Sequence, residues 1–156
     1  MFIALPVIGQ SSSTYYWVGG GGEWTDLSHW STSSGGLGSQ YLNPPSPQDD
    51  VIFDVNSGFT STDRTVVTSE INGATVRNMS WINAPNSPIF EENPITDFVV
   101  LGSLVLQRDM IFRAQVLMMG NNDASITSNG CKIGGNLYID KQNSTITLND
   151  SLMLYF

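Results

Sequence analysis

Charged residues are scarce in this sequence, at 13% of 156 residues, and basic residues are the scarcest of them. Six Lys and Arg stand against fourteen Asp and Glu, which gives a net charge of −8, and the six basic residues never cluster. Nucleic acids and anionic membrane surfaces are bound through a concentrated basic face. The composition therefore argues against nucleic acid or an anionic membrane as a partner.

Cysteine and long apolar runs are also missing. The single cysteine, Cys131, has no partner for an internal disulfide and no Cys or His at metal-ligand spacing, which favours a small buried residue in a strand. No apolar run approaches the about 20 residues of a membrane helix. Residues 1–13, MFIALPVIGQSSS, look like the second half of a secretory signal peptide, although no Lys or Arg precedes them. We expect a signal-peptide remnant or a first strand here.

Alternation of apolar residues with a period of two is the main structural signal. Seven of the eight even positions from 104 to 118 are apolar, against four of the nine odd positions from 103 to 119. This period predicts strands, because a helix would point the same residues all round its axis. The alternation recurs at Cys131, Ile133, Leu137 and Ile139, and again at Ile146, Leu148, Leu152, Leu154 and Phe156.

Three short segments also share a pattern of a turn-forming residue, a small polar residue and Leu-x-aliphatic. They are Gly102–Leu106, Gly135–Ile139 and Asp150–Leu154, and their starts lie 33 and 15 residues apart. Irregular repeats are typical of a solenoid whose coils carry loops of different length. We therefore predict an all-β fold, a right-handed parallel β-helix with an N-terminal Trp/Gly-rich cap. An antiparallel β-sandwich is the alternative, because it too has short alternating strands.

The two parts of the chain differ in composition, and this predicts its organisation. Residues 14–60 are rich in aromatic residues, Gly and Pro, whereas the later part is repetitive and aliphatic. A solenoid must cover its terminal coil, so we expect a cap at 14–60 and β-helix coils at 61–156. Since the apolar alternation runs to the final SLMLYF, we also expect the coils to continue in a longer parent protein.

Four motifs occur in an order that resembles a known group of proteins: YYWVGGGGEWTDLSHWSTSSGG, PSPQDDVIFD, VRNMSWI and VLGSLVL. The resemblance is to the N-terminal region of large secreted, adhesin-like cell-surface proteins of Bacteroidetes-type bacteria, and it covers most of Tyr15 to Leu154. Many members have a cysteine where this chain has Val76.

The resemblance implies type IX secretion, a place at the bacterial cell surface and a non-enzymatic role in attachment or gliding motility. Implied partners are outer-membrane export or motility proteins, surface polysaccharide and the remainder of the parent chain. A carbohydrate-binding module and a polysaccharide-processing β-helix are the alternatives.

The opening motif supplies the first candidate site. Tyr15, Tyr16, Trp17, Trp24 and Trp30 could form a flat aromatic platform for sugar rings, or pack together as the core of the cap. The glycines at 19–22 lack the Gly-Lys-Ser/Thr of a phosphate loop. They are better explained as letting the backbone turn tightly beneath Trp17 and Trp24.

Acidic residues supply the second candidate site, a calcium site. Asp49, Asp50 and Asp54, with Asp26, are candidate calcium ligands, since a hard cation needs several oxygens. In the other interpretation, Asp49 or Asp50 caps the turn after the prolines at 44–47 and Asp54 ends a strand.

Catalytic groups are poorly represented. His29 is the only histidine, and no Gly-x-Ser-x-Gly motif accompanies it, so we expect a packed or hydrogen-bonded residue. Glu91 and Glu92 are expected to lie in a Pro/Asn-rich loop without the apolar walls that raise a carboxyl pKa. We therefore predict no enzymatic activity.

Overall fold

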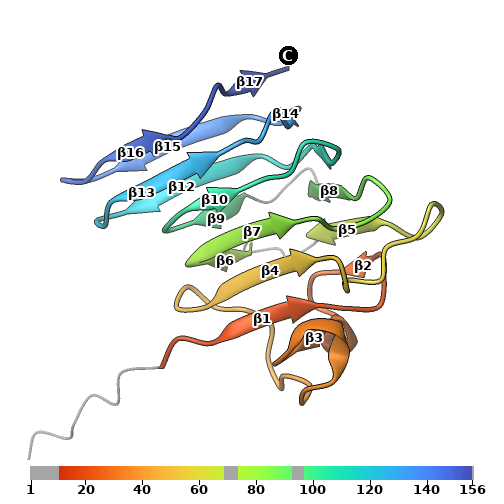
Figure 1. Cartoon of the computed structure of the whole chain (residues 1–156). Helices are drawn as coiled ribbons and strands as arrows, with labels where there is room; N and C mark the ends of the chain where they lie inside the picture. Colours follow the sequence, from red (N-terminus) through yellow and green to blue (C-terminus); the bar gives the residue numbers. More distant parts are fainter. Residues whose placement is uncertain (1–10, 69–73, 93–96, 156) are drawn as a thin grey trace, which may run out of the picture.

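The computed structural model describes residues 11–68, 74–92 and 97–155, which form an all-β fold of parallel sheets (Figure 1). Most of the predicted signal-peptide remnant, residues 1–10, lies outside the described residues. Within those ranges no helix is long and apolar enough to cross a membrane.

The strands belong to three sheets. In spatial order, the first sheet contains β16 (Ile146–Leu148), β13 (Ala124–Thr127), β10 (Leu104–Val105), β7 (Asn78–Ile82), β4 (Asp50–Asp54), β1 (Thr14–Trp17) and β3 (Trp30–Ser31). The second contains β17 (Met153–Leu154), β14 (Lys132–Ile133), β11 (Ile111–Phe112), β8 (Ile89–Glu92), β5 (Thr65–Thr68) and β2 (Gly22–Glu23). The third contains β15 (Leu137–Lys141), β12 (Val116–Gly120), β9 (Phe98–Val100) and β6 (Thr75–Val76). Two short 3₁₀ segments, η1 (Leu27–His29) and η2 (Ser34–Gly36), lie between β2 and β4.

Successive strands enter the three sheets in turn, so that β4, β5 and β6 are followed by β7, β8 and β9, and so on to β16 and β17. We call any three consecutive strands, one from each sheet, a layer, so that β15, β16 and β17 form the last layer. Neighbouring layers pair in parallel, and among the described strand pairs only β1–β3 is antiparallel. The antiparallel β-sandwich is therefore wrong, and the parallel all-β class is confirmed.

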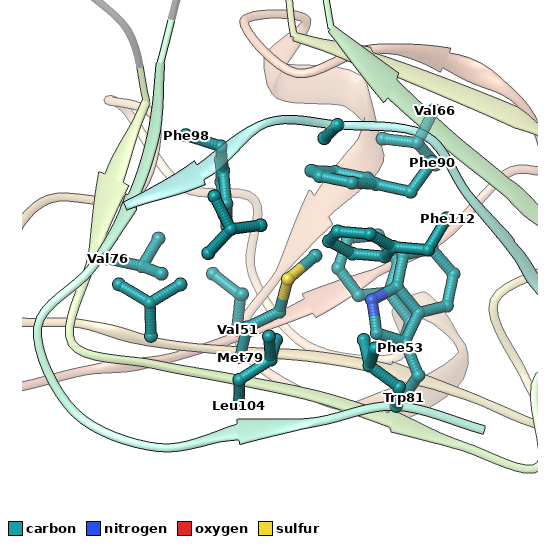
Figure 2. Close-up of a cluster of buried hydrophobic side chains, with 14 of the residues drawn as sticks. Val51, Phe53, Val66, Val76, Met79, Trp81, Phe90, Phe98, Leu104 and Phe112 are labelled. Carbon is teal, nitrogen blue, oxygen red and sulfur yellow. The ribbon is translucent and has the colours of Figure 1, made fainter. Parts of the chain in front are cut away.

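The predicted alternation determines which side chains form the core. All seven apolar residues at even positions from 104 to 118 are buried, whereas Arg108 is exposed. Figure 2 shows that equivalent positions of neighbouring layers stack, as in the column of Val51, Met79 and Leu104. Beside it the rings of Phe53 and Trp81 lie parallel with centroids 3.8 Å apart. Strand pairing and side-chain stacking therefore share one register.

Cys131 has the buried place in this core that the sequence predicted. Its side chain is fully buried, and desolvation raises the pKa of the thiol to about 11. The thiol therefore stays protonated at neutral pH and packs as a small apolar group.

The three segments that share a sequence pattern do not stack on one another. They contain β10, β15 and β17, which belong to three different sheets. The pairing period near the C-terminal end is instead 22 residues, as in the succession Leu104, Ile126 and Leu148. The pattern marks the start of a strand after a turn, and every sheet has such starts.

The N-terminal region is continuous with these sheets. β1, β2 and β4 pair in parallel with later strands or one another, so strand pairing begins well before the boundary predicted near residue 60. Among the residues that the structure describes, only the segment between β2 and β4 departs from the layered pattern, and its β3 adds to the outer edge of β1 (Figure 1). This segment covers the first layer.

The alternation also predicts that the even-numbered apolar residues at 98–118 and 146–156 stack into a continuous core, and the last layer is the exception to this prediction. Ile139, Leu148 and Leu154 pair with buried residues of the preceding layer, yet they are 54%, 51% and 39% exposed. No described strand lies beyond them. The continuous core therefore holds for positions 98–118 and is open along 139–154, while Phe156 lies outside the described residues.

Candidate functional site

The aromatic residues of the opening motif form a buried cluster. Trp17, Trp24 and Trp30 are at most 1% exposed and Tyr15 is 6% exposed. Trp30 meets Trp17 and Trp24 edge to face, with ring centroids 4.9 and 4.8 Å away. The indole nitrogens donate within the cluster, from Trp17 to the Gly20 carbonyl at 2.6 Å and from Trp30 to the Trp24 carbonyl at 2.7 Å.

The packed-core interpretation is thus confirmed and the carbohydrate platform is wrong for these four rings, because none has an open face. Of the predicted set, only Tyr16 is partly exposed. A single partly exposed ring is not a platform.

The glycine run and His29 complete the cluster. Gly19 and Gly20 have φ values of +84° and +86°, which favour glycine, and a Cβ on Gly22 would lie 2.1 Å from His29 Nε2. The His29 ring stacks on Trp17 with centroids 4.5 Å apart, and its Nδ1 donates to the Val18 carbonyl at 2.7 Å. Both predicted structural roles, the tight turn and the packed histidine, are confirmed.

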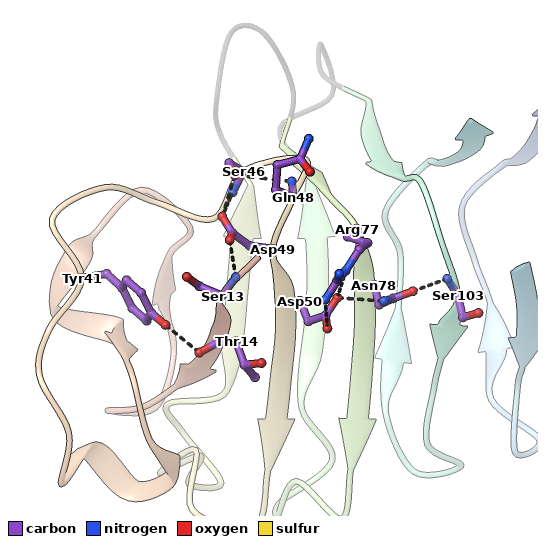
Figure 3. Close-up of polar contacts among 10 residues, drawn as sticks. All are labelled: Ser13, Thr14, Tyr41, Ser46, Gln48, Asp49, Asp50, Arg77, Asn78 and Ser103. Atoms are coloured by element: carbon purple, nitrogen blue, oxygen red, sulfur yellow. Dashed lines mark hydrogen bonds and ion pairs between the residues drawn. The ribbon is translucent and has the colours of Figure 1, made fainter. Parts of the chain in front are cut away.

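The candidate calcium ligands are engaged by protein donors. Asp49 accepts from the backbone nitrogens of Ser13 and Ser46 at 2.9 Å and from the Ser46 hydroxyl at 2.6 Å (Figure 3). Asp54 accepts from the Asn56 nitrogen at 2.8 Å, and Asp26 caps η1. The turn-capping interpretation of Asp49 is confirmed. Within the described ranges no three His, Cys, Asp or Glu side chains form a group that could hold a metal ion.

Asp50 has a different role, because it joins neighbouring layers. Its carboxylate accepts from Arg77 Nε and Nη2 at 2.7 and 2.6 Å and from the Asn78 amide at 2.7 Å (Figure 3). Asn78 in turn accepts from the Ser103 nitrogen at 2.7 Å. Burial alone would raise the pKa of Asp50, but the hydrogen bonds from Arg77 and Asn78 outweigh it and lower that pKa.

This network predicts a pH-dependent contribution to stability. A carboxyl whose pKa is lower in the folded state stabilises the fold above its unfolded pKa of about 3.9, and the contribution is lost as the pH falls through the folded pKa. We expect Asp50→Asn to lower the free energy of unfolding at pH 7 by about 1 kcal/mol, with a smaller difference at pH 3. Urea unfolding at both pH values checks this. Asp140→Asn is the exposed control, and an equal loss in both variants would contradict the role of Asp50.

Glu91 and Glu92 are placed differently from our expectation. They lie in strand β8 and not in a loop, and burial raises the pKa of Glu92. Glu92 lies on the same side of the strand as buried Phe90, whereas Glu91 pairs with Arg113 at 3.3 Å. Consecutive strand residues face opposite sides, so the two carboxylates do not face each other across a cleft.

A polar corner that we did not predict lies between the first and second sheets. It is formed by the turns β7–β8, β10–β11 and β13–β14, which stack in three successive layers. Two adjoining cavities of about 460 and 400 Å³ share Asn83, Gln107 and Arg108. We call this region the corner groove.

The walls of the corner groove are held in place by hydrogen bonds. Gln107 accepts from the Ala84 nitrogen and donates to the Ala84 carbonyl, both at 2.8 Å. Arg64 Nη1 donates to the carbonyls of Asn86 and Ser87 at 2.9 and 3.1 Å. These contacts fix a turn in which Asn83, Asn86 and Ser87 all have positive φ.

The side chains of Arg108 and Asp109 are exposed along the groove, and they make no hydrogen bond or ion pair with any other residue that the structure describes. They are therefore free to bind a ligand. The sequence feature that could have indicated the corner groove is the Asn/Pro-rich turn at 83–88. However, only the stacking of layers brings this turn beside residues 107–109.

No protein-family model, no curated protein and no solved structure matches this chain.

Proposed function

We propose that this chain is a structural and interaction module of a secreted, adhesin-like bacterial surface protein, folded as a right-handed parallel β-helix. The β-helix is supported by the order of the strands, which enter three parallel sheets in turn. The adhesin assignment, with export by type IX secretion and a role in attachment or gliding, is supported by the four motifs that occur in order between Tyr15 and Leu106.

The observation that carries an adhesive role is the corner groove. Stacked layers give a rigid wall, and the groove adds Asn83, Gln107, Arg108 and Asp109 to it as hydrogen-bonding groups. Amide, guanidinium and carboxylate groups are suited to the hydroxyl and carboxyl groups of a polysaccharide. We therefore place the carbohydrate contact in this groove and not on the buried aromatic cluster.

Binding to immobilised envelope polysaccharide of the source bacterium tests this function. The wild-type chain is expected to bind saturably, and Arg108→Ala to weaken binding about tenfold or more, since charged hydrogen bonds contribute about 1.5–3 kcal/mol. Arg113→Ala is the matched control, because Arg113 is exposed in the turn between β11 and β12, outside the groove. Equal affinity in all three proteins would refute the groove as the contact site.

Antibody labelling of cells tests the location separately. Labelling of intact cells is expected without permeabilisation. A signal that needs permeabilisation would contradict the surface assignment.

A further inference from the structure

Arg108 differs in its contacts from the other five basic residues of the chain. Those five each have a partner: carboxylates bind Arg77 and Arg113, backbone carbonyls accept from Arg64 and Lys141, and Lys132 Nζ lies 5.1 Å from the centre of the Tyr155 ring. Arg108 makes no such contact with any residue that the structure describes. The five N–H donors of its guanidinium are therefore available to a ligand.

The corner groove positions this guanidinium without neutralising its charge. Arg108 lies against the turn between β13 and β14, where a Cβ on Gly130 would be 3.7 Å from Arg108 Nε and 3.9 Å from Cζ and Nη2. These are ordinary van der Waals distances. Packing against backbone restricts the side chain before a ligand arrives, which reduces the conformational entropy lost on binding.

The other available groups of the groove suit hydroxyl groups. Asp109 is exposed next to Arg108 in the chain, and an ionised carboxylate only accepts hydrogen bonds. The side chains of Asn83 and Ser87 line the same cavity and make no hydrogen bond within the described ranges. Asp109 would also repel a second anion. The groove therefore fits a ligand with one negative charge at Arg108 and hydroxyl groups around it.

We propose that the corner groove selects an acidic sugar, with a carboxylate bound by Arg108 and hydroxyl groups that donate to Asp109. The planar guanidinium matches a carboxylate as a bidentate pair. One cation beside Asp109 balances the single charge of a carboxylate, whereas a phosphate monoester carries about 1.5–2 charges. This inference rests on the proposed polysaccharide contact and names the chemical class of its ligand.

The test compares envelope polysaccharide of the source bacterium before and after carboxyl reduction, which converts each carboxylate to a primary alcohol and leaves phosphate and sulfate esters in place. In titration calorimetry the whole chain is expected to bind the reduced form about tenfold or more weakly than the native form. Arg108→Ala should lose the same factor with the native form and bind both forms equally. Arg113→Ala is the control and should keep the wild-type preference, because Arg113 already pairs with Glu91.

Asp109→Ala gives the complementary result. Its hydroxyl partners remain in both forms, so this variant should weaken binding of both by a similar factor, about fivefold or more. It should therefore keep the preference for the native form that Arg108→Ala loses. An unchanged melting temperature shows that each variant is folded.

Two outcomes would overturn the acidic sugar and leave the adhesive function in place. One is equal binding of the native and reduced forms by the wild-type chain. The other is a preference for the native form that Arg108→Ala keeps, since this would place the carboxylate away from the groove. Absence of binding to the native polysaccharide would instead refute the proposed function, and this inference with it.

Discussion

Replacing Trp24 with Ala is expected to lower the free energy of unfolding by about 3–5 kcal/mol, as for other large buried aromatic residues. Trp24 is 1% exposed, and its ring meets Trp30 at 4.8 Å, Phe98 at 5.3 Å and Phe90 at 6.2 Å between centroids. These neighbours belong to β3, β9 and β8, so one side chain joins the N-terminal segment to two sheets of the layered core. Its removal leaves a cavity where the segment packs.

Urea unfolding followed by far-ultraviolet circular dichroism measures this loss. Leu37→Ala is the matched control from the same segment, because Leu37 is 95% exposed and its truncation is expected to change stability by about 0.5 kcal/mol or less. Equal midpoints for the two variants would show that the aromatic cluster does not hold the segment to the sheets. A loss of stability confined to the first layer would appear as faster amide exchange in β1.

The strands could be predicted because the information for them is local. Met110, Phe112 and Val116 are buried by the alternation that their own neighbours define, whatever lies opposite. The same alternation predicts Cys131 in the core. Local pattern also explains Asp49, whose turn-capping contacts reach Ser46 only three residues away.

The position of each strand in the three sheets could not be predicted from the local sequence. Leu104 and Leu137 follow similar turns, yet one lies in the first sheet and the other in the third. Which strand lies beside which depends on the lengths of all the turns between them. The irregular spacing of the similar segments, 33 and 15 residues, therefore does not show the 22-residue pairing period.

The candidate sites could not be predicted for the same reason, because they depend on which strands and layers lie side by side. The sequence shows that Trp17 and Trp24 are large and flat, which suits both a sugar platform and a core, and only their burial decides between the two. In the corner groove, Asn83 and Arg108 are 25 residues apart and meet because two layers stack. The burial that raises the pKa of Glu92 likewise comes from the position of β8 within its sheet.

Gly135→Ala is expected to loosen the last layer. A Cβ at this position would lie 2.2 Å from the Ala114 carbonyl oxygen and 2.7 Å from that of Arg113, both backbone atoms of the preceding layer. The neighbouring hydrogen bonds, from Gly134 N to the Phe112 carbonyl at 2.7 Å and from Val116 N to the Asn136 carbonyl at 2.8 Å, hold the two backbones at this spacing. Backbone cannot turn aside as a flexible side chain can, so the layers must separate at an overpacking cost of about 1–3 kcal/mol.

Hydrogen exchange resolves this effect by position. The amides of β14 and β15 should lose about 5- to 100-fold in protection, whereas those of β4 and β7 should not change, because layers distant from the substitution open independently. Gly134→Ala is the control, since its Cβ would meet only the Phe112 oxygen at 3.3 Å and a small shift relieves that contact. An equal loss of protection in the two variants would show that the close approach of the two backbones at Gly135 does not fix the position of the last layer. The exposed aliphatic side chains of β15 and β16 would then be held in position by their own packing on Met118 and Ile126.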